Sequence, residues 1–175
     1  IERGDLEAAR SLLAGAREQE PFDGEICFHY AQVCYETLHL DEASAALAEW
    51  QTLQRLDSTL IANIALLLTN LGEPRRAEVA LRQARADKAA PTGALLTVIA
   101  VLERINRLTE ARELMDRLLA DPKADLQSPE RLAVEAQLLQ REGKHAEAET
   151  LFTRALPGKD EFHRRHLRLF PIAKS

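Results

Sequence analysis

A small residue recurs in this sequence at a nearly constant spacing. The alanines in question are Ala9, Ala43, Ala77 and Ala111, which follow one another at a period of about 34 residues, and Ala148, which comes slightly later than that period would place it. Neighbouring columns also match: Gly4, Leu38, Gly72, Asn106 and Gly143 precede these alanines by five positions, and Leu13, Leu47, Leu81, Met115 and Phe152 follow by four. A third column, seven positions after, holds Ala16, Trp50, Ala84, Leu118 and Ala155. Matched columns at one spacing indicate an internal repeat, and a repeat constrains the fold more than any single motif.

Pairs of antiparallel helices explain all of these columns. Hydrophobic residues make up 46% of the chain and only 5% are aromatic, and abundant Ala, Leu, Glu, Arg and Gln favour helix. The Gly, Asn or turn residue five before each alanine is expected to end a first helix in a left-handed conformation. The alanine allows two helices to approach closely, and the larger residue four further on fills the core from the same face. The prediction is an all-α chain.

Helix boundaries can be predicted from capping residues and prolines. Asp41 and Thr109 are candidate N-caps of second helices. Links between pairs are marked by Pro21, Pro91 and Pro122. A short insertion precedes the last pair and should lengthen its link. There Ser128-Pro129-Glu130 is typical of a cap, a first-turn proline and a first-turn acid.

The spacing and columns resemble the tetratricopeptide repeat family. The matching segments are residues 4–9, 40–43, 71–77, 108–111 and 143–148, and the resemblance covers residues 1–156. It implies a right-handed α-solenoid of antiparallel helix pairs, with about four and a half repeats. Residues 157–175 then form either a capping helix or the start of a linker to a further domain. In this register Ile1 lies near the end of a first helix, so we expect a longer parent protein.

Charge and hydropathy exclude several classes of partner. The net charge is −5, which argues against non-specific nucleic-acid binding. The segment 159–175 holds five basic and two acidic side chains and carries +3, as a contact patch or as a solvated helix. No stretch approaches the ~20 apolar residues of a membrane span. We expect a cytoplasmic protein, with the periplasm as the alternative because the sequence does not begin with Met.

No constellation of residues indicates catalysis, a cofactor or a metal. Cys27 and Cys34 lie two turns apart in one expected helix, about 10 Å along its axis, which is too far for a disulfide. Both fall on the apolar face and are expected to be buried. His163 and His166 have a spacing that a metal could use, but two arginines lie between them and no third ligand is evident.

The resemblance implies that first helices line a concave groove that binds a partner protein or peptide. The predicted groove residues are Phe28, Gln32, Tyr35, Asn63, Leu66, Asn70, Leu96, Glu103, Arg104 and Arg141. Phe28, Tyr35, Leu66 and Leu96 are expected to be the anchors for that partner. Some family members clamp acidic chaperone tails. Asn63 matches one clamp position, but Gly93 and Thr97 replace the expected basic residues, so a chaperone-tail ligand is not supported.

Three functions are compatible with this pattern. The first is a protein-interaction scaffold that holds a peptide or helix in its groove. The second is a non-catalytic repeat domain of a larger bacterial enzyme, such as a sulfotransferase or another transferase. The third is a chaperone similar to those of type III secretion. An open N-terminal end that lacks half a pair would also favour self-association through its apolar surface.

Overall fold

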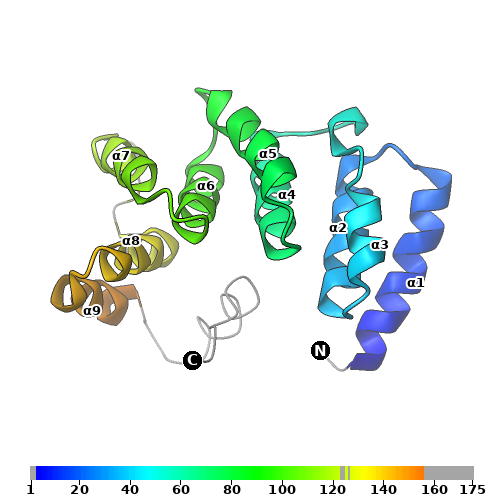
Figure 1. The fold of residues 1–175 in the computed structure, drawn as a ribbon, viewed down its shortest axis with the longest axis horizontal. Coiled ribbons are helices and arrows are strands. Elements are labelled where there is room, and N and C mark those ends of the chain that lie inside the picture. Colours follow the sequence, from blue (N-terminus) through cyan, green and yellow to red (C-terminus); the bar gives the residue numbers. More distant parts are fainter. Residues whose placement is uncertain (1–2, 123–124, 126, 156–175) are drawn as a thin grey trace. The chain divides into compact units, whose positions relative to one another are not determined.

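The computed structural model describes residues 3–122, 125 and 127–155, and every regular element assigned among them is a helix (Figure 1). The helices are α1 (Arg3–Gln19), α2 (Gly24–Glu36), α3 (Leu40–Ala46), the 3₁₀ helix η1 (Trp50–Thr52), α4 (Ser58–Asn70), α5 (Pro74–Ala86), α6 (Thr92–Arg104), α7 (Leu108–Leu119), α8 (Pro129–Arg141) and α9 (His145–Ala155). The all-α prediction is confirmed. The chain divides between Asn106 and Arg107 into two compact units, the first ending with α6 and the second beginning with α7.

In the first unit, most helices pack against a neighbour in the chain, and α4 also packs against α6. α1 packs on α2, α2 on α3, and α4 on both α5 and α6. The most deeply buried helix of this unit is α4, in which nine of the thirteen residues are buried. A helix that is apolar on nearly every face is expected at the centre of a helical assembly, and α4 has two packing partners.

The alanine column occupies equivalent places in successive second helices. Ala43 lies in α3, Ala77 in α5, Ala111 in α7 and Ala148 in α9, and all four are buried. Ala9 in α1 is half-buried. Each buried alanine has no side chain beyond Cβ, so neighbouring helices can approach closely there. The prediction for these four positions is confirmed.

Four of the five turn-column residues take the left-handed backbone that the repeat requires. The prediction is wrong at Gly4, because α1 begins at Arg3 and continues through this position. The φ angles of the other four are 67° at Leu38, 75° at Gly72, 62° at Asn106 and 79° at Gly143. At three of these turns a pair of backbone hydrogen bonds closes the helix end: for example, Gly72 donates to the carbonyl of Thr69, and Glu73 donates to that of Leu68. This is the Schellman pattern, which satisfies carbonyls that would otherwise lack partners. Leu38 adopts it without the freedom of glycine.

The cap predictions succeed at one helix and fail at two. The side chain of Ser128 accepts a hydrogen bond from the backbone of Arg131, and Pro129 begins α8. Asp41 and Thr109 lie inside α3 and α7, whose N-cap residues make no side-chain cap. The caps that form at α2 and α4 come from Asp23 and Asp57, which the repeat columns did not single out.

The links between pairs agree with the proline positions. Pro21 lies between α1 and α2, Pro91 precedes α6, and Pro122 lies between α7 and α8. Residues 120–128 join α7 to α8, whereas residues 87–91 join α5 to α6. The longer link before α8 is the one expected from the insertion.

The helix α3 stops earlier than its counterparts. The column at Trp50 implies a second helix that continues through this position, as α5 does at Ala84, but α3 ends at Ala46. The guanidinium of Arg76 in α5 donates hydrogen bonds to the carbonyl oxygens of Ser44 and Leu47 at this end. Trp50 then turns into the core in η1 and is 2% exposed. A side chain from another helix therefore caps α3.

The chain after η1 pairs with the beginning of α2. Gln54 donates a backbone hydrogen bond to Phe22 and accepts one from Gly24, in a short parallel bridge. A Cβ atom on Gly24 would lie 2.6 Å from the Gln54 carbonyl oxygen, so this approach requires glycine. Arg55 forms an ion pair of 2.8 Å with Asp23, the buried cap of α2.

The second unit is built on α8 and α9. Leu132, Ala133 and Ala155 form one buried cluster, and Ala136, Leu139 and Ala148 form another. The guanidinium of Arg112 in α7 binds both carboxylate oxygens of Glu142 at 2.8 Å, which ties α7 to the end of α8. Arg112 holds the pKa of Glu142 below its usual value.

Both cysteines are free and buried in α2, as predicted, with exposed fractions of 1% at Cys27 and 0% at Cys34. Burial raises the pKa of each thiol. Each therefore behaves as a small apolar side chain at neutral pH. The expected C-terminal segment 157–175, with His163 and His166, lies outside the described residues.

Candidate functional site

One face of α2, α4 and α6 keeps accessible polar side chains on helices that are otherwise largely buried. The positions follow i, i+4, i+7 and i+11 spacing and recur at the same period as the alanine column. We call this set the first-helix stripe: Glu25, His29, Gln32 and Glu36 in α2; Thr59, Asn63, Leu66 and Asn70 in α4; Gly93, Thr97, Ala100 and Arg104 in α6. Of these, Leu66 and Ala100 are buried. Because α4 packs on α6 and contacts α2, three rows of the stripe belong to adjacent helices.

The stripe offers mainly neutral hydrogen-bonding groups. Gln32, Thr59, Asn63, Asn70 and Thr97 are half-exposed amides and hydroxyls. An amide both donates and accepts, and a hydroxyl does the same. Such groups can bind a polypeptide backbone or polar side chains without the desolvation cost of a charge.

Charged groups gather at the C-terminal ends of the same helices. The guanidinium of Arg104 donates a hydrogen bond to the side-chain oxygen of Asn70, which lies one repeat earlier in the chain. Burial lowers the pKa of Arg104, and the nearby Glu103 and Tyr35 act in the opposite direction. Four of the predicted groove residues, Tyr35, Asn70, Glu103 and Arg104, are thus brought together.

Three of the four predicted anchors lie beneath this surface, and the fourth, Tyr35, is half-exposed. Leu66 and Leu96 are each 6% exposed and Phe28 is 9% exposed. Their burial places them in the packing of the unit, where a partner would reach little of their surface. The remaining predicted residues of this unit, Gln32, Tyr35, Asn63, Asn70, Glu103 and Arg104, are half-exposed.

The sequence prediction omitted His29 and combined two registers. His29 is exposed and lies one repeat before Asn63, so the repeat spacing could have identified it. Its ring packs against Phe28 at a centroid distance of 5.4 Å. Phe28 and Leu96 belong to a column one residue away from the stripe, which faces the core.

Arg141 belongs to the second unit. It lies in the last turn of α8 and is exposed, as is Gln140 beside it, while Gln137 is half-exposed. The second unit therefore carries its own accessible polar residues on α8.

The described residues hold no cluster of three or more His, Cys, Asp or Glu side chains that could bind a metal. None of the helices in the described part of the chain is long and apolar enough to span a bilayer.

These features define an all-α helical-repeat protein with a polar, accessible face on its first helices. The family model described as tetratricopeptide repeat matches residues 1–66, so the predicted resemblance is confirmed over this part of the chain. Such repeats generally mediate protein–protein interactions and are typically non-catalytic. No curated protein matches the sequence at a significant level.

Proposed function

We propose that the chain is a protein-interaction module and that the first-helix stripe binds a polypeptide segment of a partner. The supporting observation is the contrast within α4. Nine of its thirteen residues are buried, yet Thr59, Asn63 and Asn70 remain accessible along one side. Polar residues on a face that needs no packing are available for recognition.

The chemistry of the stripe favours a segment that offers its own backbone. Amides at Gln32, Asn63 and Asn70 can pair with peptide N–H and C=O groups at successive positions. At the end of the stripe, Arg104 favours an acidic partner side chain and Glu103 favours a basic one. Because Phe28, Leu66 and Leu96 are buried, polar contacts supply most of the specificity in this proposal.

Photo-crosslinking tests the surface without a known partner. A photoreactive amino acid is placed at Asn63, and at Gln83 as the matched control, because Gln83 is an exposed amide on α5 outside the stripe. We expect a discrete adduct from position 63 in cells and none from position 83.

The double substitution Asn70→Ala with Arg104→Ala should reduce the adduct from position 63 severalfold, since it removes the polar end of the stripe. Circular dichroism checks that helical content is retained. Equal adducts from positions 63 and 83, or an adduct insensitive to the double substitution, would contradict the proposal.

The interpretations as an accessory domain of an enzyme and as a secretion chaperone receive no specific support from the described residues. Both stay predictions from the sequence.

A further inference from the structure

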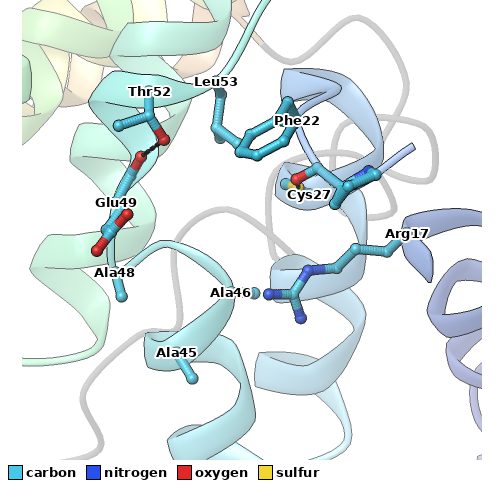
Figure 2. Close-up of a pocket in the computed structure, with 10 residues that line it drawn as sticks. Arg17, Phe22, Cys27, Ala45, Ala46, Ala48, Glu49, Thr52 and Leu53 are labelled. Atoms are coloured by element: carbon cyan, nitrogen blue, oxygen red, sulfur yellow. Dashed lines mark hydrogen bonds between the residues drawn. The ribbon is translucent and has the colours of Figure 1, made fainter. Parts of the chain in front are cut away.

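A pocket opens in the first unit where α3 stops early (Figure 2). Its volume is about 230 Å³. The wall is formed by Arg17, Pro21, Phe22, Cys27, Ala45, Ala46, Ala48, Glu49, Thr52 and Leu53. These residues come from the end of α1, the link to α2, the start of α2, the end of α3 and η1. None belongs to the first-helix stripe, so this is a separate surface.

The pocket wall combines apolar and polar surface in about equal shares, and its apolar part comes from seven of the ten lining residues. Three alanines from the end of α3 and the turn after it leave space because they have no side chain beyond Cβ. Phe22 lies beside Leu53 at one edge, as Figure 2 shows, and 56% of its surface is exposed. A large exposed aromatic group beside a pocket that combines apolar and polar surface can contribute to an interaction site.

Arg17 adds a positive charge to this wall. Its guanidinium lies 5.4 Å from the centre of the Tyr30 ring, which holds the side chain in place. Among the described residues, no acidic side chain lies within ion-pair distance of Arg17. The neighbouring Cys27 thiol is neutral, because burial raises its pKa. A half-buried guanidinium without an acidic partner is suited to binding a carboxylate.

Glu49 determines which way round an acidic occupant would bind in the pocket. It lies on the opposite side of the view from Arg17 in Figure 2, with Ala46 between them. A carboxylate would be repelled by Glu49 and attracted by Arg17. The acidic group of an occupant therefore belongs at the Arg17 side.

We propose that this pocket docks one large apolar side chain of a partner protein and that Arg17 pairs with a carboxylate beside that side chain. The volume lies below the roughly 300 Å³ at which pockets for drug-sized ligands begin, so it suits a single side chain. Phe22 and Leu53 cover the inserted group and exclude water from its edge. The partner is a polypeptide segment with an aromatic or aliphatic residue next to an acidic group.

The minimal probe is N-acetyl-phenylalanine, which combines an apolar side chain with a carboxylate. In a titration followed by ¹H–¹⁵N NMR, we expect saturable shifts at Arg17, Cys27, Ala46 and Thr52. N-acetyl-phenylalaninamide lacks the charge and should bind about fivefold more weakly, as expected for a partly exposed ion pair.

Charge reversal gives the sharper test. Arg17→Gln should abolish the preference for the acid over the amide, and Arg17→Glu should transfer the preference to phenylalaninamide, whose amine is positively charged. Arg82→Gln is the matched control, because Arg82 is an exposed residue of α5, and it should leave the preference for the acid unchanged. Ala48→Phe should weaken every probe severalfold, because the new ring occupies the pocket.

Shifts that do not saturate, or a preference for the acid that persists in Arg17→Gln, would overturn the proposal. Tighter binding of free phenylalanine than of its N-acetyl form would also overturn it, because the site would then prefer a small zwitterion to a polypeptide. None of these three results bears on the first-helix stripe, which the probes do not reach.

Discussion

Leu38 occupies a position at which the repeat demands a left-handed backbone. Glycine or asparagine meets that demand in the three later turns, but here an L-residue with a full side chain has φ of 67°. Its Cβ makes this conformation unfavourable by about 1–2 kcal/mol. The side chain is 75% exposed, so burial offsets little of that cost.

Leu38→Gly should therefore stabilise the protein, by about 0.5–1 kcal/mol after allowance for the greater freedom of glycine in the unfolded chain. Urea denaturation measures the change. Leu40→Gly is the matched control: Leu40 is also exposed but lies in α3, where glycine should destabilise. Equal effects of the two substitutions would show that the backbone of Leu38 is not strained.

Glu42 joins three helices through its carboxylate. Tyr30 in α2 donates its hydroxyl at 2.7 Å, and Arg10 in α1 donates to both carboxylate oxygens at 3.0 and 3.3 Å. The hydrogen bond from Tyr30 and the charge of Arg10 lower the pKa of Glu42 below 4.5. Desolvation and the same hydrogen bond raise the pKa of Tyr30, which keeps its proton for donation.

A carboxyl group whose pKa is lower in the folded state stabilises the protein above its unfolded pKa. This contribution should fall as the pH drops below about 4.5 and vanish below the folded pKa. Urea midpoints between about pH 7 and pH 3 measure it. We expect the stability difference between wild type and Glu42→Gln to shrink towards acid pH. In a Tyr30→Phe background, the same difference should be smaller at neutral pH. A difference that is constant with pH would contradict this role.

At the scale of the element, α3 departs most from the repeat. Residues 47–52 contain neither glycine nor proline, and local propensity would extend the helix through them. Arg76 instead binds the last carbonyls of α3, and Trp50 is buried in η1. A contact between groups far apart in the chain thus outweighs local preference.

Arg76→Gln should remove the hydrogen bonds to the last carbonyls of α3. The first unit should lose about 1–3 kcal/mol of stability, the range for hydrogen bonds that involve a charged group. Arg75→Gln, on the exposed side of the same helix, should change stability by less than about 0.5 kcal/mol. Denaturation gives the free energy of unfolding, and amide hydrogen exchange should accelerate at Ala48 and Trp50. Unchanged exchange in Arg76→Gln would show that Arg76 does not hold the end of α3 in place.

At the scale of the whole molecule, each unit divides its first helices between core and surface. Leu66 and Leu96 were expected on an accessible groove, but both are 6% exposed, while Asn63 one turn away is half-exposed. The repeat register placed these residues on the correct helices. Leu96 is buried because it lies one column away from the stripe, whereas Leu66 belongs to the stripe and is buried there with Ala100.

Leu66→Glu should therefore destabilise the first unit by at least the ~2–5 kcal/mol of a buried Leu→Ala substitution, because it also buries a charge. Asn63→Glu should change stability by about 0.5 kcal/mol or less. Thermal unfolding followed by circular dichroism compares the two variants. Similar small effects at both positions would restore Leu66 as a surface anchor.

Residue order alone was enough to predict the helical repeat, its period, four of the five left-handed turns, the buried alanines, the burial of both cysteines and the Ser128 cap. These features depend on local backbone preference and on periodic burial, and both are visible along the chain. The early end of α3, the approach of Gly24 to Gln54 and the pocket beside Arg17 could be seen only once the chain was folded. Each of them depends on groups far apart in the sequence, whose contacts outweigh local propensity and leave no periodic pattern.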